Sequence, residues 1–212
     1  MTSTPMESPL FERLDAVSFP TLGHFLERGF AQPAIRAMVP NVKIVGRAVT
    51  LKLVTPDAFA VNRALAALNA GDVLVIDPCG DHAHAPVGAV TACAALNAGA
   101  KAIIVDGVVT DLLELRALGL PVFARGTSLL TTKRLGAPGN LPGVPVTCGG
   151  VVVNPGDIVV ADDNGVLFMD ASTAAAVVDL ALASDRAEPA LLARLNAGEA
   201  ARDVLTLNPS SD

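Results

Sequence analysis

Between residues 43 and 124, short apolar runs alternate with helical segments, and this alternation constrains the fold more than any other feature of the chain. The run Lys43–Val54 is rich in β-branched residues and alternates in polarity, which is typical of a strand. Three shorter runs have the length and apolar character of strands buried on both faces. They are Val73–Asp77, Ala102–Val105 and Leu120–Ala124.

Helical segments separate these strands. The segment Ala58–Asn69 has helical periodicity, Gly88–Ala98 is rich in small residues, and Asp111–Leu118 ends at Gly119. A chain that alternates strands with helices in this way forms βαβ units around parallel strands. We therefore expect a partly parallel sheet at the centre of the protein.

The alternation stops after this region. We predict a loop over Gly136–Gly143, and Asp162–Gly165 has the sequence of a tight hairpin turn. Four short strands are expected around these turns: Val144–Thr147, Val151–Val153, Ile158–Ala161 and Val166–Met169. Helices are expected over Pro9–Val17 and Thr21–Arg28, and in a C-terminal arm that begins at Asp170 or Ser172. The pattern predicts one α/β domain over residues 1–212, with mixed layered sheets and helices at both ends.

Composition argues against several classes of partner. Charged residues make up only 17% of the chain, which favours a subunit that buries area against copies of itself, although a monomer rich in Ala and Val has a similar composition. Stacking platforms for bases require aromatic rings, but the chain has seven Phe and neither Trp nor Tyr. A net charge of −6 also opposes binding to a phosphate backbone. We expect no nucleic-acid partner.

The sequence also predicts a cytoplasmic protein with no membrane partner. No apolar run is long enough to span a bilayer, and the first residues lack the apolar core of a secretory signal. Cys79, Cys93 and Cys148 are scattered and form no CxxC pair, so we expect reduced thiols. The common nucleotide, zinc-protease and serine-hydrolase motifs are absent.

A ligand site is therefore expected in the loops at the carboxyl ends of the strands. Two such loops carry polar residues, Asp77–Gly88 and Val105–Glu114. Asp111 is the main candidate in the second loop, but it also forms a D-x-x-E pattern with Glu114. That pattern is typical of a helix cap, so Asp111 has both a functional and a purely structural interpretation.

At these residues the sequence resembles the RraA-like family, which includes 4-hydroxy-4-methyl-2-oxoglutarate aldolases. The resemblance covers most of the chain. Its strongest stretches are GRAVT (Gly46–Thr50), AGDVLVID (Ala70–Asp77), VDGVVTDLLELRALGLPVFARGTS (Val105–Ser128) and PVTCGGVVVNPGDIVVADDNGV (Pro145–Val166). It implies a swivelling β/β/α fold that assembles as a homotrimer or a dimer of trimers.

The resemblance also implies the chemistry of a class II aldolase acting on a small keto acid. Gly88 matches a glycine that begins a substrate-binding segment, and the following amides, at Val90 and Thr91, would bind the substrate carboxylate. Asp111 matches the residue that holds Mg²⁺ (or Mn²⁺). The implied reactions are retro-aldol cleavage and decarboxylation of the oxaloacetate type, and both pass through a pyruvate enolate.

Two positions depart from the family pattern. Thr110 stands where the family has an Arg that holds the keto or enolate oxygen, and Ala89 stands where an acid is common. A threonine offers one neutral hydroxyl in place of a charged, two-pronged donor. Either the usual mechanism is weakened or the substrate differs, and Thr110 remains our candidate for the catalytic position.

Four further residues have alternative interpretations. His82 and His84 lie in the first loop, where they could replace the lost cation, act as a general base or bind a metal, or could simply be part of an exposed polar loop. Arg125 follows the strand Leu120–Ala124 and could bind a substrate carboxylate or pair with an acid. Lys52 could form a Schiff base, but a solvent-facing lysine on an edge strand is the simpler expectation.

Three functions therefore remain open. The first is a divalent-metal lyase on a small keto acid. The second is a non-catalytic binding or regulatory protein, of which the family's ribonuclease E inhibitors are examples. The third is a divergent enzyme that uses the loop carrying His82 and His84 as its base.

Overall fold

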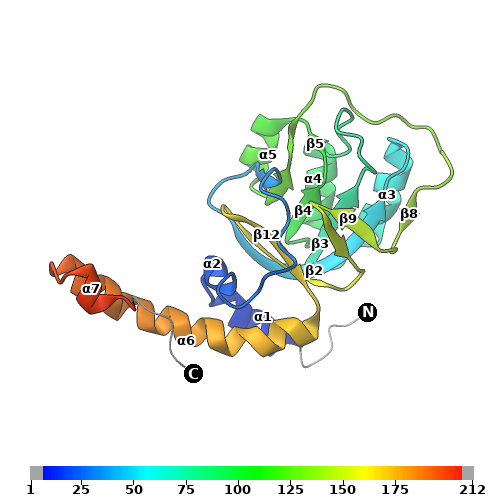
Figure 1. Ribbon diagram of the computed structural model, residues 1–212. Helices are drawn as coiled ribbons and strands as arrows, with labels where there is room; N and C mark the ends of the chain where they lie inside the picture. The colour runs from blue at the N-terminus through cyan, green and yellow to red at the C-terminus, as the bar shows by residue number, and fades with distance from the viewer. Residues whose placement is uncertain (1–6, 207–212) are drawn as a thin grey trace.

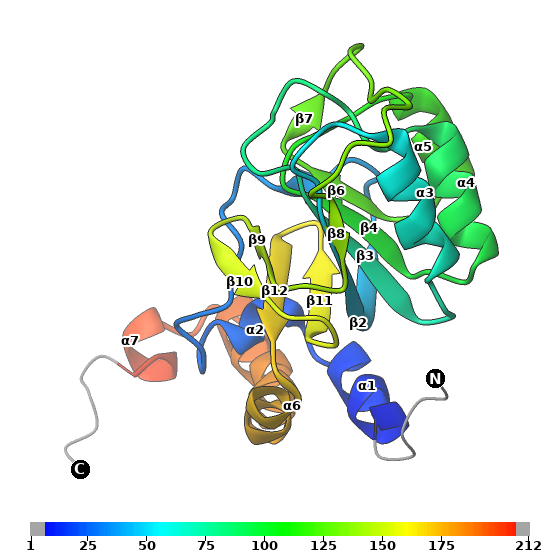
Figure 2. The ribbon, with the colours of Figure 1, turned by 90° about the vertical axis from the view of Figure 1, so that its right-hand side faces the viewer.

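The structure, a computed structural model, describes residues 7–206 and is built on an eight-stranded mixed sheet (Figures 1 and 2). In spatial order the strands are β1 (Arg36–Ala37), β6 (Val122–Ala124), β4 (Ala102–Val105), β3 (Asp72–Asp77), β2 (Lys43–Lys52), β11 (Ile158–Asp162) and β12 (Gly165–Met169), and β8 (Leu141–Pro142) pairs with the end of β2. The pairs formed among β2, β3, β4 and β6 are parallel, as the βαβ pattern predicts, and the other pairs are antiparallel.

The sheet curls until its two ends approach each other. The segment that leads into β1 reaches β12, where Phe30 forms a bridge with Leu167 and the Ala31 amide donates to the Val166 carbonyl at 2.9 Å. The result is a nearly closed barrel. The expected mixed α/β architecture with helices at both ends is confirmed.

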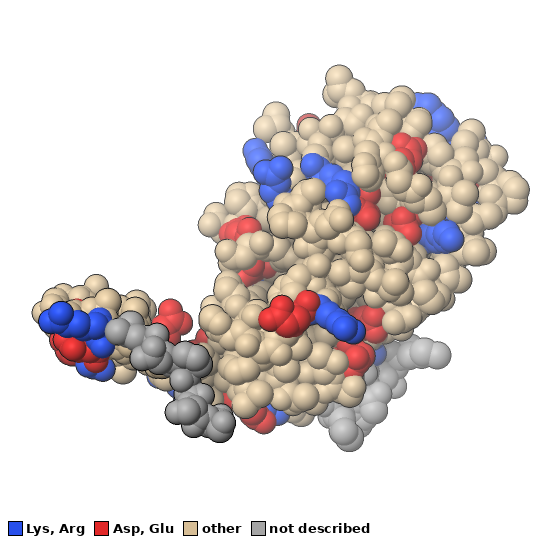
Figure 3. Space-filling model, in the orientation of Figure 1, with Lys and Arg blue, Asp and Glu red and all other residues tan. Residues whose placement is uncertain are grey.

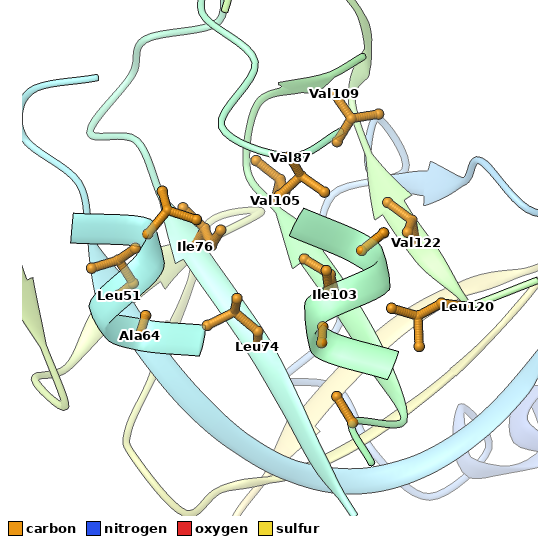
Figure 4. Close-up of a cluster of buried hydrophobic side chains, with 14 of the residues drawn as sticks. Leu51, Ala64, Leu74, Ile76, Val87, Ile103, Val105, Val109, Leu120 and Val122 are labelled. Atoms are coloured by element: carbon orange, nitrogen blue, oxygen red, sulfur yellow. The ribbon is translucent and has the colours of Figure 1, made fainter. Parts of the chain in front are cut away.

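The core strands are buried on both faces, because successive side chains of a strand point to opposite sides. The inward-facing side chains of β3 and β4 are Val73, Val75, Ala102 and Ile104, which pack inside the barrel with Phe123 and Phe168. The outward-facing side chains of the same strands are Leu74, Ile76, Ile103 and Val105, which pack under the helices (Figure 4). Burial on both faces explains why these strands have continuous apolar sequences.

Two groups of helices cover the barrel. Helices α3 (Ala58–Ala66), α4 (Ala89–Asn97) and α5 (Leu112–Leu118) lie together on the side of the parallel strands (Figure 2). Helices α1 (Glu7–Asp15), α2 (Phe19–Leu22) and α6 (Ala171–Asn196) cover the outer face of β11 and β12. Helix α6 begins at Asp170, whose carboxylate caps it by accepting from the Thr173 amide at 2.8 Å.

The second half of α6 projects away from the barrel, together with α7 (Ala201–Val204) (Figure 1). The buried residues of α6 all lie in its first half and end at Ala181. Charged side chains are sparse over much of the face seen in Figure 3. Along residues 7–206, no helix combines the length and the apolar character that crossing a bilayer requires.

Four short strands complete the described structure. Strands β9 (Val146–Cys148) and β10 (Val151–Val153) form a hairpin, and β5 (Val108–Val109) pairs in parallel with β7 (Gly126–Thr127). The predicted strand Val144–Thr147 is therefore shifted by one to two residues. The two-residue strands β1, β5 and β7 were not expected, and β8 lies within the segment predicted as a loop.

Two further predictions are wrong. The helix expected over Thr21–Arg28 is only the four-residue α2, because the chain must turn at Gly29 and pass close to β12. A Cβ atom on Gly29 would lie 2.2 Å from the Phe168 carbonyl oxygen. Lys52 does not lie on an edge strand, since it sits between Asp77 of β3 and Leu141 of β8 in the sheet register.

Candidate functional site

The loops that follow the parallel strands come together at one end of the sheet. The Thr110 amide donates to the Val87 carbonyl at 2.9 Å, and the Ser128 amide donates to the Val109 carbonyl at 2.9 Å. These bonds align the segments that follow β3, β5 and β7. The predicted convergence of the two polar loops is confirmed, and a third loop, which follows β6, joins them.

The carboxylate of Asp111 lies against the N-terminus of α4. Its Oδ2 atom accepts a hydrogen bond from the Ala89 amide at 2.9 Å. A Cβ atom on Gly88 would lie 2.5 Å from this same oxygen and 2.8 Å from Cγ2 of Thr110. Only glycine therefore leaves space for Asp111 at this position, which gives Gly88 a steric role.

Asp111 does not cap its own helix, so the D-x-x-E interpretation is wrong as a local motif. Its backbone is left-handed, with φ 55° and ψ 44°, and its side chain makes no capping bond to α5. A non-glycine residue in this conformation is uncommon and such residues concentrate at functional sites. The side chain instead supplies the acceptor at the start of α4, where the N-cap residue Gly88 has no side chain to offer.

A small pocket of about 240 Å³ opens beside this carboxylate. It is lined by Thr110, Asp111, Leu112, Thr127, Ser128 and Leu129. The Thr110 hydroxyl lies 3.4 Å from Oδ1 of Asp111, which is a long contact. Sequence reasoning missed Thr127, Ser128 and Leu129. The available signal was their position, shortly after Leu120–Ala124, the last strand of the expected parallel set.

The donor set around Asp111 fits a magnesium or manganese ion better than zinc. Within residues 7–206, no three His, Cys, Asp or Glu side chains are close enough together to hold a metal ion. Structural and catalytic zinc sites need three or four such ligands. Mg²⁺, in contrast, is commonly held by one or two carboxylates while it keeps several waters. An exposed single carboxylate such as Asp111 meets that requirement.

The loop that carries the two histidines is organised by Asp81. Its Oδ1 atom accepts from the Ala83 and His84 amides at 2.8 and 3.1 Å, and its Oδ2 atom lies 2.7 Å from Nδ1 of His84. Burial acts to raise the pKa of Asp81, but these bonds outweigh it and the pKa is lowered below its usual range. The Asp81 carboxylate therefore orients the His84 ring through its Nδ1 atom.

The histidines do not line the pocket beside Asp111. His82 is exposed and His84 is half-buried. The chain runs from His84 to Gly88 past Ala85, which bridges to Thr131. The structure thus places both histidines on the loop that leads to the site, but outside the pocket itself.

Arg125 is committed to an ion pair. Its Nε atom lies 2.5 Å from Oδ1 of Asp106, and its Nη2 atom donates to the side chain of Gln32 at 3.1 Å. Of the two roles open to Arg125, the structure supports pairing with an acid, and we do not include it in the proposed site.

Two strand-end acids have a structural role that sequence reasoning missed. Asp77 accepts from the Thr147 amide and Asp106 accepts from the Gly149 amide, both at 3.0 Å. Together they fasten the β9–β10 hairpin to the ends of β3 and β4. Cys148 lies between the two anchored amides and is buried, and desolvation raises the pKa of its thiol well above the usual value. It is a packing residue.

Comparisons with known proteins agree with this architecture. The family model described as RraA-like, Aldolase/RraA, matches residues 14–168. A protein of Halalkalibacterium halodurans, provisionally named 4-hydroxy-4-methyl-2-oxoglutarate aldolase, is 38% identical over 132 residues, and the match spans 62% of this chain and 62% of that relative.

Two solved structures are also similar. The structure of Streptomyces coelicolor RraAS2, described as an unusual member of the RNase ES inhibitor RraA family, has 29% identity and a TM-score of 0.73, with 88% of this chain and 96% of that chain covered. An uncharacterized protein from Pseudomonas syringae has a TM-score of 0.81 at 24% identity, with 96% of each chain covered, and supports the fold alone.

Proposed function

This chain belongs to the RraA-like family, and from that membership we propose that it is a lyase that cleaves a carbon–carbon bond in a small keto acid. The reaction is a retro-aldol cleavage or a decarboxylation of the oxaloacetate type, and the common intermediate is a pyruvate enolate. The observation that carries the proposal is the exposed carboxylate of Asp111, held by the Ala89 amide at the edge of a pocket lined by hydroxyl groups.

The first turn of α4 would bind the carboxylate of the substrate. Ala92 is the first residue of this helix whose amide reaches an intrahelical acceptor, the Gly88 carbonyl. The amides of Val90 and Thr91 precede it and have no acceptor within the helix. The N-terminus of a helix also carries partial positive charge, which suits a carboxylate.

Asp111 would hold the metal ion through its carboxylate. Mg²⁺ or Mn²⁺ supplies positive charge that stabilises an enolate oxygen. Thr110 would add one neutral hydroxyl beside that oxygen, at the position where the family resemblance implies an Arg. Loss of one such donor typically slows a reaction by a factor of about 10²–10³, so we expect slow turnover.

We also propose that the protein assembles as a homotrimer or a dimer of trimers. The second half of α6 projects from the barrel, and Leu191 and Leu192 are exposed on it. Exposed leucines on a projecting helix are stabilised by contact with another subunit. Light scattering at micromolar concentration should give three or six times the chain mass of 21.5 kDa, and a mass of one chain contradicts the proposal.

A second candidate function is a binding or regulatory protein on the same scaffold. The replacement of the family Arg by Thr110 favours it, as does the description of the Streptomyces coelicolor relative as an RNase inhibitor family member. A protein of this kind would bind a partner and release no pyruvate.

The experiment that separates the two candidates measures pyruvate release from three substrates: oxaloacetate, 4-hydroxy-4-methyl-2-oxoglutarate and 4-hydroxy-2-oxopentanoate. Each is assayed with and without Mg²⁺. The lyase proposal predicts metal-dependent pyruvate release from at least one of them. Absence of release from all three, at protein concentrations that match the substrate, contradicts it and leaves the binding function.

A further inference from the structure

The pocket beside Asp111 has no basic side chain among the six residues that line it. Three of these residues offer hydroxyl groups, two are leucines, and the sixth is Asp111 itself. The Ser128 hydroxyl oxygen accepts from the Leu130 amide at 3.1 Å, so its proton remains available to a ligand. The pocket therefore offers neutral hydrogen bonds and apolar contacts.

Three exposed aliphatic side chains lie on the segments that meet at this pocket. Leu129 is 98% exposed, and Val90 and Leu113 are 85% and 76% exposed. Val90 and Leu113 lie on the first turns of α4 and α5, the two helices whose N-termini meet at Asp111. Large aliphatic side chains gathered around a polar site mark a surface that contacts a ligand or a partner.

These features decide which substrates the pocket suits. A carboxylate loses its hydration when it enters a pocket. Its burial is costly unless a cation or several hydrogen-bond donors replace that water. None of the six lining residues is basic, so no protein cation balances a second carboxylate here. A hydroxyl or a short alkyl group meets hydroxyls and leucines here without such a cost.

We propose that the substrate is a monocarboxylate, a 2-keto acid whose far end is an uncharged hydroxyalkyl group. This inference rests on the proposed lyase function and narrows its substrate class. Thr127 and Ser128 bind the hydroxyl of the substrate, and Leu112 and Leu129 contact its alkyl end. The same residues select against substrates that carry a second carboxylate.

The reaction is balanced without an oxidant or a reductant. In 4-hydroxy-2-oxopentanoate the C4 hydroxyl gives its proton to water and the C3–C4 bond breaks. The electron pair of that bond passes to the C2–C3 unit and forms the enolate of pyruvate, while C4 leaves as acetaldehyde. A proton then adds to C3 and gives pyruvate.

A matched pair of unreactive ligands tests the inference. 2-Oxopentanoate and 2-oxoglutarate have the same chain length and differ only at the far end, which is a methyl group in the first and a carboxylate in the second. Calorimetry in the presence of Mg²⁺ should give a dissociation constant at least about tenfold lower for 2-oxopentanoate. Among the three reactive substrates, 4-hydroxy-2-oxopentanoate should have the highest kcat/KM.

The variant Leu129→Arg should reverse the preference within the ligand pair, because it adds a cation to the pocket wall at a side chain that is almost fully exposed. Leu135→Arg is the matched control, since Leu135 is also exposed but does not line the pocket. The control should keep the preference for 2-oxopentanoate.

Tighter binding of 2-oxoglutarate by the unmodified protein overturns the inference about the substrate. If pyruvate is still released from a dicarboxylate, the proposed lyase function survives that result. If pyruvate is released from none of the three substrates, the lyase function fails and the substrate inference fails with it.

Discussion

The Oδ2 atom of Asp111 lies 2.9 Å from the amide nitrogen of Ala89, so the acid that precedes α5 serves the N-terminus of α4. One carboxylate thereby joins the starts of two helices, and the two bonded residues are 22 positions apart in the chain. Its other oxygen is directed to the Thr110 hydroxyl at the edge of the pocket. The arrangement depends on Gly88, because any side chain there would occupy the position of the carboxylate.

The first prediction separates the two roles of Asp111. Asp111→Ala should lower the free energy of unfolding by about 1 kcal/mol, since the start of α4 loses its acceptor. Asp111→Asn keeps an oxygen that can accept from the Ala89 amide, so its free energy of unfolding should fall much less. Unfolding in urea without metal measures both values.

The same variants then report on metal binding. For the unmodified protein, Mg²⁺ at a hundred times its dissociation constant should stabilise the fold by about 2.7 kcal/mol, and Asp111→Asn should abolish that gain. An equal gain in Asp111→Asn would show that Asp111 is a helix cap and holds no metal.

The second prediction concerns the space at Gly88. In Gly88→Ala the new methyl group must displace the Asp111 carboxylate, which we expect to destabilise the protein by about 1 kcal/mol and to weaken the response to Mg²⁺. The control is Gly126→Ala, because Gly126 has open space at its Cβ position and no positive φ. Equal behaviour of the two variants in thermal unfolding would refute the steric role.

The third prediction tests the missing cation. Thr110→Arg should raise pyruvate release by about tenfold or more, because it restores a charged donor beside the developing enolate. His82→Ala and His84→Ala should change the rate little, since neither histidine lines the pocket.

If the loop that carries His82 and His84 has taken over the chemistry, the expected effects of these variants are reversed. The histidine variants then lose activity, and Thr110→Arg is harmful. Initial rates of the four proteins over a range of pH values distinguish the two outcomes.

The fourth prediction concerns the pH dependence of the cap of α6. Hydrogen bonds from the Ser172 hydroxyl, and then from the amide and hydroxyl of Thr173, lower the pKa of Asp170 from 3.8 to about 2. Because the pKa is lower in the folded state, the stabilisation is complete above pH 3.8 and is lost as the pH falls through about 2.

Asp170→Ala should therefore be less stable than the unmodified protein at neutral pH, and the difference should shrink in that acid range. Urea midpoints measured for both proteins at several pH values check this. A difference that does not change with pH would mean that the Asp170 charge contributes nothing.

Much of the fold could be predicted from the sequence, because strands buried on both faces leave continuous apolar runs such as Val73–Asp77. The convergence of the strand-end loops followed from the expected parallel order. The two-residue strands β5 and β7 could not be predicted, since so few residues carry no periodicity. The short α2 depends on the approach of Gly29 to β12, a tertiary contact.

The candidate site could also be predicted only in part from the sequence. The sequence and its family resemblance predicted Gly88 and Asp111 as candidate site residues, but the local spacing of Asp111 and Glu114 indicated the wrong capping partner. The true partner, the Ala89 amide, belongs to another helix and only the fold brings it near. Arg125 illustrates the reverse case, because an arginine at a strand end has no local feature that distinguishes a ligand contact from its pairing with Asp106.

The central claim is that Asp111 and its metal ion stabilise a pyruvate enolate. Hydrogen–deuterium exchange into pyruvate tests this claim most directly, because pyruvate lacks the far end at which the candidate substrates differ. In D₂O with Mg²⁺, the methyl protons of pyruvate, followed by NMR, should exchange faster with the unmodified protein than with Asp111→Asn or with Mg²⁺ alone. An exchange rate that is the same in all three samples would contradict the claim.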